Sequence, residues 1–371
     1  MKKVKILTFH RAHNYGAVLQ TYALQKNLTE MGYNAFVCDY RNLRIENRYK
    51  PICFKGKSIK KQVKNLIKYG LYHKKMNLRY KEFNKFINTK MNLSKSFYSI
   101  EDLENAVEEN DIYISGSDQV WNKKIVGELS DIYTLKFNTK NGRKISYAAS
   151  VGQDSLIDEN KNEYYEKISK LDKISVREEN TQKALEKIIT EKDITVVLDP
   201  TLLLSKNQWN EEIDNTEIVV SEKYICAYVV QPDEEYIKIV NNLSEKTGLR
   251  VIHFDMRNPG YKNVLKSAYS EGPLEFVKYI KNAEYVVTTS FHATVFSVIF
   301  NKKFFCVPHK TTGSRVTNLL NKLDVKDRVY YNLEDFKDID YKFETNWENV
   351  EKKLEQEREK SLNWLKNAIE G

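Results

Sequence analysis

The hydrophobic pattern of this chain alternates between short apolar runs and longer segments in which apolar residues recur every three or four positions. Apolar runs bounded by glycine, proline or polar residues predict buried strands, and the longer periodic segments predict amphipathic helices. Strands are predicted at residues 4–9, 35–38, 111–115, 144–149, 174–176, 195–198, 224–230, 250–254, 284–289 and 304–307. Because predicted helices separate most of these runs, the pattern is typical of parallel α/β sheets.

One interruption divides this pattern. The dipeptide Asp199-Pro200 follows a predicted strand, and the alternation restarts after Leu204. Proline restricts the residue before it and breaks regular structure, so we interpret this dipeptide as a structural hinge. Each half predicts a doubly wound, Rossmann-like α/β domain, and we expect the two domains to face a cleft. The predicted parts are an N-terminal domain, a C-terminal domain and a C-terminal helix, at residues 1–203, 204–345 and 346–371.

Positive charge is concentrated in one segment of the predicted N-terminal domain. Residues 41–90 hold 16 lysines and arginines against two acidic residues, whereas the remainder holds 44 against 49. Within this basic insert, residues 59–72 and 74–87 have apolar residues at helical spacing, which predicts two lysine-faced amphipathic helices. Such helices fit either a solvated pair packed on the domain or docking on an anionic membrane leaflet. Nucleic acid is disfavoured as a partner, because the chain has no recognisable nucleic-acid motif.

The overall composition is that of a soluble globular protein, with 41% hydrophobic and 30% charged residues. No segment is apolar enough to predict a membrane span, and the apolar run at residues 4–7 is too short for a signal peptide. The cysteines lack metal-type spacing, so we expect free thiols in a reducing cytoplasm. They are Cys38, Cys53, Cys226 and Cys306. We therefore expect a cytoplasmic protein, either free in solution or peripheral at the inner face of the cell membrane.

The turn Ser290-Phe291-His292 contains the strongest candidate for a functional residue. A strand is predicted before it at residues 284–289, and a buried helix after it at residues 293–300. This order places His292 beyond the carboxyl end of a strand, where parallel α/β sheets bind ligands. The free N–H groups at the helix start also favour an anion there. The alternative is a helix-capping or core histidine, and the placement favours the functional interpretation.

The other polar candidates at predicted strand or loop ends are Asn14, Asp118, Trp121, Arg177 and Arg315. Arginine offers a planar fork that matches carboxylate and phosphate, so Arg177 and Arg315 would suit a small, highly anionic substrate. Arg177 fits a salt-bridge arginine as the alternative. Asn14 is expected to cap a helix first of all. Asp118 and Trp121 fit either a turn with a core contact or a polar and stacking platform for a sugar.

Several common functional motifs are missing from the sequence. It contains no Gly-x-Gly-x-x-Gly motif, no P-loop and no Gly-x-Ser-x-Gly elbow. A dinucleotide site, a Walker-type phosphate site and an α/β-hydrolase nucleophile are therefore unsupported. Histidine pairs at metal spacing are also missing, so we predict that the protein needs no metal and no cofactor.

Five short motifs, taken in order, resemble those of the polysaccharide pyruvyl transferases. They are residues 14–20 (NYGAVLQ), 116–122 (GSDQVWN), 175–178 (SVRE), 198–201 (LDPT) and 290–292 (SFH). Each motif is weak alone, but the order and spacing match over nearly the whole chain. The resemblance implies a glycosyltransferase-B-like fold of two Rossmann-type domains. It also implies transfer of a pyruvyl group from phosphoenolpyruvate to two hydroxyls of a sugar as a cyclic ketal, with a glycan or lipid-linked glycan as the acceptor.

The resemblance also implies roles for single residues. Arg177 matches a donor-binding arginine of the first domain, and His292 matches the site histidine of the second. Some members have Arg-Leu-His where this chain has Ser290-Phe291-His292, so a donor-binding arginine is missing at position 290. Either Arg315 in the next loop replaces it, or the donor differs. His292 is the candidate for proton transfer, because the unperturbed pKa of histidine lies near neutrality.

Two other functions remain open at this point. The first keeps the fold and changes the donor, giving a glycosyltransferase that uses a nucleotide sugar. The missing arginine at position 290 favours it. The second is a non-catalytic, membrane-docked component that binds glycans, which only the basic insert favours.

Overall fold

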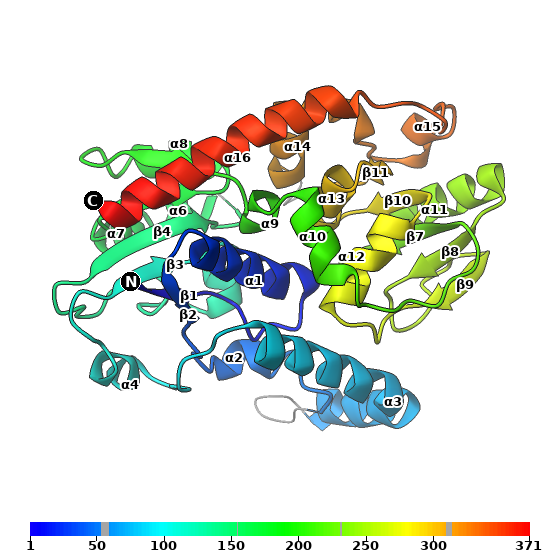
Figure 1. Ribbon diagram of the computed structural model, residues 1–371. Helices are drawn as coiled ribbons and strands as arrows, with labels where there is room; N and C mark the ends of the chain where they lie inside the picture. Colours follow the sequence, from blue (N-terminus) through cyan, green and yellow to red (C-terminus); the bar gives the residue numbers. More distant parts are fainter. Residues whose placement is uncertain (53–58, 154, 231, 309–313) are drawn as a thin grey trace. The chain divides into compact units, whose positions relative to one another are not determined.

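The chain forms two compact units, each built on a parallel sheet with helices against it (Figure 1). The computed structural model describes residues 1–52, 59–153, 155–230, 232–308 and 314–371. Unit 1 consists of Met1–Tyr49, Lys85–Leu204 and Glu355–Gly371. Unit 2 consists of Lys50–Asn84 and Ser205–Leu354. The predicted basic insert and the predicted C-terminal helix are therefore each divided between the two units.

Unit 1 contains a six-stranded parallel sheet with the strand order β2-β1-β3-β4-β5-β6. Its strands are β1 (Lys3–Leu7), β2 (Asn34–Val37), β3 (Ile112–Ser115), β4 (Arg143–Ala149), β5 (Lys173–Val176) and β6 (Ile194–Val196). All four residues of β3 are buried, as expected for a central strand of a parallel sheet. The winding changes direction between β1 and β3, and ligands bind doubly wound sheets at such a switch point.

The helices of unit 1 follow the predicted alternation. They are α1 (Tyr15–Glu30), α2 (Leu43–Glu46), α4 (Ile100–Asn105), α5 (Lys123–Val126), α6 (Ser155–Glu159), α7 (Lys161–Ile168), α8 (Glu179–Glu186) and α9 (Pro200–Leu203). The sheet face opposite α1 is unusual, because β1 alternates fully buried Val4 and Ile6 with half-buried Lys3 and Lys5. Helix α4 covers part of this face, because its buried Leu103 belongs to the same core cluster as Leu7, Cys38 and Tyr113.

Unit 2 contains a five-stranded parallel sheet with the strand order β11-β10-β7-β8-β9. Its strands are β7 (Tyr224–Tyr228), β8 (Arg250–His253), β9 (Val264–Ser267), β10 (Tyr285–Thr288) and β11 (Lys303–Cys306). Its helices include α10 (Lys206–Ile213), α11 (Glu234–Thr247), α12 (Pro273–Asn282), α13 (Phe291–Ile299), α14 (Ser314–Lys322) and α15 (Leu333–Phe336). The winding changes direction between β7 and β10. The residues that follow β10 therefore lie at the switch point of this sheet.

Two predictions about elements were wrong. Where two helices were predicted in the basic insert, at residues 59–72 and 74–87, the structure has one continuous helix, α3 (Ile59–Lys90). No proline interrupts this segment, and Gly70 alone does not break a helix. Strand β9 was not predicted, because it is a partly exposed edge strand in which Lys266 interrupts the apolar run.

The last helix, α16 (Trp347–Glu370), ends in unit 1. Leu198 N donates to Ser361 Oγ at 3.0 Å, and Arg358 Nε donates to Leu202 O at 2.9 Å. Near the end of the helix, Arg143 Nη1 donates to Ala368 O at 2.9 Å. The final turns of α16 therefore bond to residues of β4 and of the segment from Leu198 to Leu202, which lie more than 150 residues earlier in the sequence.

Candidate functional site

Four of the motifs that suggested a family meet in unit 1 in one buried hydrogen-bond network. Gln20 Nε2 donates to Thr8 Oγ1 at 3.1 Å, and Thr8 Oγ1 donates to Ser117 O at 2.8 Å. Ser117 Oγ donates to Asp199 Oδ2 at 2.9 Å, and the same oxygen accepts from Arg177 Nη1 at 3.0 Å. This network joins the loops after β1, β3 and β5 to the start of α9. Hydrogen bonds therefore hold together four motifs that lie far apart in the sequence.

Arg177 directly follows β5 and is buried in this network with two carboxyl groups. Its Nε donates to Glu178 Oε1 at 2.8 Å, while its Nη1 donates to Asp199. Burial disfavours the charged guanidinium, but the nearby carboxylates of Glu178, Asp199 and Asp118 outweigh it and raise the pKa of Arg177 above its ordinary value. The guanidinium charge is therefore already balanced within unit 1. Its predicted contact with the donor stays a prediction.

Asp199 has a larger role than the predicted hinge. It precedes Pro200, the first residue of α9, and its Oδ1 accepts from the backbone N of Thr201 at 3.0 Å and from Thr201 Oγ1 at 2.6 Å. Its other oxygen accepts from Ser117 and Arg177. One carboxylate therefore caps a helix and anchors the arginine. Pro200 explains the break in the alternation of strands and helices, but the bond from Arg177 to Asp199 is visible only in the folded structure.

Asn14 and Asp118 adopt local structural roles. Asn14 caps α1, because its Oδ1 accepts from the backbone N of Gly16 at 3.0 Å and of Ala17 at 3.3 Å. Capping was the role predicted first for this residue. Asp118 has a positive φ of 78°, and its Oδ1 accepts from the backbone N of Gln119 at 2.8 Å. Aspartate tolerates this left-handed turn better than most residues.

Of the two interpretations given for Trp121, the stacking platform for a sugar is contradicted by the burial of the side chain. The side chain is fully buried in the core of unit 1, and its Nε1 donates to Tyr133 O at 3.2 Å. A ring with no exposed face cannot stack on a sugar. The alternative interpretation, a core contact after the turn, is the one that the structure supports.

Sequence reasoning missed a second polar cluster at the carboxyl edge of the same sheet. Asp39, after β2, is 2.9 Å from His10 Nε2, and Arg11 Nε donates to it at 2.8 Å. Ser96 Oγ donates to its other oxygen at 2.5 Å. Burial alone would favour the neutral carboxyl, but the hydrogen bonds from His10, Arg11 and Ser96 outweigh it and hold the pKa of Asp39 well below its usual range. The sequence signal was present, because His10 and Arg11 follow the strand predicted at residues 4–9, and β1 borders the switch point.

The switch point of unit 2 has a different chemistry. Ser290 is the N-cap of α13, and its Oγ accepts from Ala293 N at 3.5 Å. Thr288 Oγ1 accepts from Ser290 N at 2.9 Å, and Thr294 Oγ1 donates to Ser290 O at 3.0 Å. His292 lies in the first turn of α13, which begins two residues before the predicted helix start, and is 8% exposed. The predicted position beyond the carboxyl end of a strand is confirmed for His292.

Arg315 lies in the first turn of α14 and is partly exposed. The loop that was predicted to carry it begins at His309, and residues 309–313 lie outside the described residues, as does Cys53. The thiols of Cys38, Cys226 and Cys306 are free and buried, and burial raises the pKa of each to about 12. These three thiols are therefore protonated at neutral pH and poor nucleophiles.

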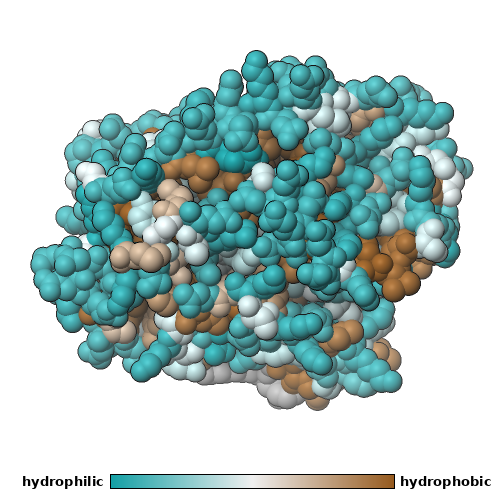
Figure 2. Space-filling model, in the orientation of Figure 1, coloured by the Kyte–Doolittle hydropathy of each residue, from teal (hydrophilic) through white to brown (hydrophobic). Residues whose placement is uncertain are grey.

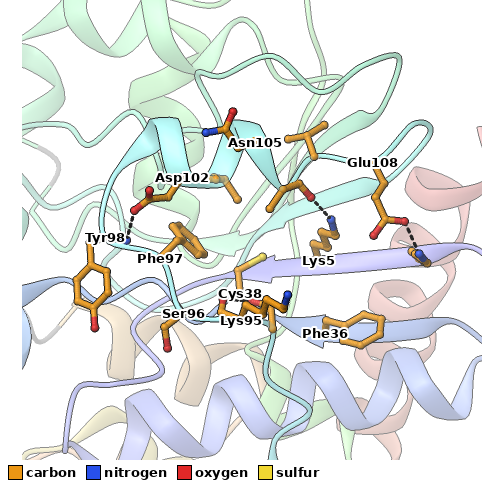
Figure 3. Close-up of a pocket in the computed structure, with 15 residues that line it drawn as sticks. Lys5, Phe36, Cys38, Lys95, Ser96, Phe97, Tyr98, Asp102, Asn105 and Glu108 are labelled. Carbon is orange, nitrogen blue, oxygen red and sulfur yellow. Dashed lines mark hydrogen bonds and ion pairs between the residues drawn. The ribbon is translucent and has the colours of Figure 1, made fainter.

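A cavity of about 830 Å³ lies in unit 1 on the sheet face that carries Lys3 and Lys5 (Figure 3). Phe36, Cys38 and residues 94–98, 102–103 and 105–108 form its other walls. Its two strand lysines already have partners, because Lys3 pairs with Glu108, and Lys5 with Asp111 at 2.5 Å. None of the predicted site residues lines this cavity. It therefore does not offer the cationic surroundings that were predicted for a phosphate donor.

No metal cluster is present among the described residues, where no three His, Cys, Asp or Glu side chains are grouped to hold an ion. In the same residues, no helix has both the length and the apolar character needed to cross a bilayer.

Comparison with solved structures supports the fold. UDP-GlcNAc 2-epimerase from Methanocaldococcus jannaschii, solved in complex with UDP-GlcNAc and UDP, is 14% identical with a TM-score of 0.52, covering 96% of this chain and 99% of that chain. UDP-N-acetylglucosamine 2-epimerase from Rickettsia bellii is 10% identical with a TM-score of 0.53, covering 100% and 97%. At such identities the likeness shows the fold alone, and it confirms the predicted glycosyltransferase-B-like class.

Comparison by sequence gives the family. A search of the curated proteins found no match. A family model for polysaccharide pyruvyl transferase matches residues 14–311, which include all five motifs and parts of both units. Since this match covers most of the sequence, the chain belongs to the polysaccharide pyruvyl transferase family.

Proposed function

We propose that this protein transfers the pyruvyl group of phosphoenolpyruvate to two hydroxyls of one sugar, in a cell-surface polysaccharide or its lipid-linked precursor. The observation that carries the proposal is the family match over residues 14–311. Two structural features support it. The matched motifs of unit 1 converge in one buried network, and the matched motif of unit 2 places His292 at a sheet switch point.

The proposed reaction proceeds by protonation of the enol. A proton is added to the methylene carbon, which becomes the methyl group and leaves the neighbouring carbon an oxocarbenium-like electrophile. One sugar hydroxyl attacks this carbon, and phosphate leaves with its bridging oxygen. The second hydroxyl then closes the ring. The two hydroxyl protons balance the proton on carbon and the one taken up by phosphate and solvent.

His292 is the residue we assign to proton transfer. An imidazole can donate and accept protons near neutral pH, and general acid–base catalysis needs such a group close to the reacting atom. The backbone N–H groups of the first turn of α13 provide partial positive charge beside it for the phosphate or carboxylate of the donor. Arg315 is the proposed cation for the same anion in unit 2, in place of the arginine that other members have at position 290.

The test is phosphate release from phosphoenolpyruvate in the presence of a panel of bacterial glycans and lipid-linked glycans. Acceptor-dependent phosphate release, with mass detection of the added pyruvyl group, is the expected result. Release without pyruvyl on the acceptor, or no release with any acceptor in the panel, contradicts the proposal. Adding a chelator tests the prediction that no metal is needed, and we expect the rate to stay unchanged.

A second candidate is a glycosyltransferase that uses a nucleotide-sugar donor. Ser290 favours it, because this chain lacks the arginine that some family members place there. The Methanocaldococcus jannaschii protein of similar fold was solved with UDP-GlcNAc and UDP. Calorimetric titration with nucleotide sugars and with phosphoenolpyruvate separates the two candidates. Binding of a nucleotide sugar without binding of phosphoenolpyruvate would select the second.

A further inference from the structure

Between residues 63 and 78, helix α3 carries a row of large apolar side chains that face solvent. Ile67 and Leu71 are 60% and 65% exposed, and Val63, Leu66 and Leu78 are each close to half exposed. Val63, Ile67 and Leu71 are spaced four residues apart, so they form one continuous stripe along the helix. In Figure 2, hydrophobic side chains appear at the bottom of the view, where Figure 1 places α3. We name Val63, Leu66, Ile67, Leu71 and Leu78 the α3 stripe.

The opposite face of α3 attaches the helix to unit 2. Arg79 Nη1 donates to Tyr269 O at 2.9 Å, and its guanidinium lies over the rings of Phe83 and Tyr269 at 4.5 and 5.1 Å. Arg257 lies 4.8 Å from the ring of Tyr72. Because these contacts already fix the helix through its other face, packing on unit 2 does not explain the α3 stripe.

Exposed lysines flank the stripe. Lys60, Lys64, Lys68, Lys74 and Lys75 are exposed, and Glu82 is the single acidic residue in the sequence of α3. Lys64 and Lys68 directly follow Val63 and Ile67, and Lys75 follows Leu71 by four residues, so on a helix these three lysines lie along one edge of the stripe. The side chain of Lys61 lies outside the described residues. The result is an outward face that combines a stripe of apolar residues with exposed cations along one edge.

We propose that α3 docks unit 2 on an anionic lipid bilayer, with the α3 stripe in the acyl boundary and the lysines at the headgroups. An interfacial helix needs this combination of a solvent-facing apolar stripe and flanking cations. Charge complementarity selects lipid over a second copy of this chain, because pairing two α3 helices would bring together two segments that each carry 16 lysines and arginines against two acidic residues over residues 41–90. Nucleic acid would attract the lysines but would leave the stripe exposed.

The first experiment measures binding of the full chain to vesicles by co-sedimentation. Vesicles of equal parts phosphatidylcholine and phosphatidylglycerol are compared with vesicles of phosphatidylcholine alone. We expect binding to the anionic vesicles and weak binding to the neutral ones, with a loss of binding as salt rises, because exposed charges are screened. Binding that is equal on both vesicles, or no binding on either, overturns the proposal.

Matched variants separate the two parts of the surface. Lys64→Gln with Lys75→Gln should weaken binding to anionic vesicles by roughly fivefold for each lysine removed. Ile67→Ser with Leu71→Ser should weaken it by about tenfold or more, because apolar burial is lost. The control for charge is Lys187→Gln with Lys366→Gln, which changes two exposed lysines outside α3. The control for exposed apolar area is Val219→Ser, because Val219 lies outside α3 and is 88% exposed. The controls should bind as the wild type does.

Two further readouts keep the test decisive. Circular dichroism of each variant checks that it is folded. Sedimentation velocity checks self-association. If the wild type forms a dimer and does not bind vesicles, and Ile67→Ser with Leu71→Ser abolishes the dimer, the α3 stripe binds a second copy of the chain and the lipid assignment is overturned. Vesicle binding requires no donor or acceptor, so its failure leaves the proposed transfer reaction untouched, and failure of that reaction leaves the docking result valid.

Discussion

The carboxyl ends of the two sheets differ in how their polar groups are used. In unit 1, the charged groups at the strand ends bond to one another, since Arg177 bonds to Glu178 and Asp199 and Arg11 bonds to Asp39. In unit 2, the end of β10 and the turn after it carry the hydroxyls of Thr288 and Ser290 and the imidazole of His292, and the two hydroxyls bond to backbone atoms. The same position in a parallel sheet therefore supports a rigid ion-pair network in one unit and a less charged helix start in the other.

This difference suggests a division of labour. A buried ion pair is costly to break, so the network of unit 1 holds its loops in one arrangement. The helix start of unit 2 leaves backbone N–H groups of α13 directed at the place where an anion would bind. We expect substitutions in unit 1 to act mainly on stability and those at the switch point of unit 2 to act mainly on turnover. The following predictions test this contrast.

The largest effect is expected for His292→Ala. Loss of a general acid–base group should lower kcat by roughly two to four orders of magnitude, with a modest change in the KM for the donor and little loss of stability. Steady-state kinetics with phosphoenolpyruvate and the identified acceptor measure it. His73→Ala, which changes an exposed histidine, is the control. Turnover within a few fold of wild type in the His292 variant would remove it from the mechanism.

The next effect is expected for Arg177→Met, measured by urea unfolding. Removing the guanidinium leaves two buried carboxyl groups without their cation, which should lower the free energy of unfolding by about 3–5 kcal/mol. Lys136→Met, which breaks an exposed ion pair with Glu166 in the same unit, should cost about 0–1 kcal/mol. If Arg177→Met instead leaves stability intact and raises the KM for the donor, the guanidinium serves the ligand more than the fold.

A smaller, pH-dependent effect is expected for Asp39→Asn. Because the pKa of Asp39 is held below its usual range, its carboxylate stabilises the fold above the unfolded-state pKa of about 4, and this stabilisation is lost as the pH falls toward the folded-state value. The variant should be less stable than wild type at pH 7, and the difference should shrink as the pH falls below about 4. Urea unfolding at several pH values measures it. A constant difference across that range would mean that the charge of Asp39 contributes nothing.

The smallest effect is expected for Ser290→Ala. The cap bond to Ala293 is long, so its loss should cost about 0.5–1 kcal/mol, at the low end for an N-cap. Ser205→Ala provides the comparison, because Ser205 caps α10 through a reciprocal capping box with Gln208 and should cost at least as much. A large loss of turnover in Ser290→Ala with unchanged stability would indicate that the hydroxyl contacts the substrate.

Much of the fold follows from local pattern. The buried runs gave ten of the strands close to their observed positions, because a strand covered on both faces must be apolar along its length. Strand β9 was not predicted, because an edge strand that is partly exposed does not need a continuous apolar run. The break predicted inside α3 had no proline to cause it. The apolar residues at its start form a stripe that faces solvent, whereas Phe83, Phe86 and Ile87 near its end are buried in the core.

The site was less predictable, for a different reason. The position of His292 follows from a strand, a turn and a helix within a few residues, so local sequence was enough. The partners of Arg177 depend on Asp199, 22 residues further along the chain, and on the winding that brings β5 beside the start of α9. The burial of Trp121 likewise depends on residues far from it in sequence. Side-chain type gives the chemistry that a residue can perform, and only the fold decides whether it is exposed to perform it.

The final turns of α16 have a consequence for synthesis on the ribosome. Unit 1 includes Glu355–Gly371, whose contacts include the bonds from Leu198 to Ser361 and from Arg143 to Ala368. These residues leave the exit tunnel only after the whole of unit 2 has been translated. Unit 1 therefore lacks these contacts while about 150 intervening residues are translated, and we expect the surface that α16 later covers to be open to chaperones during this interval.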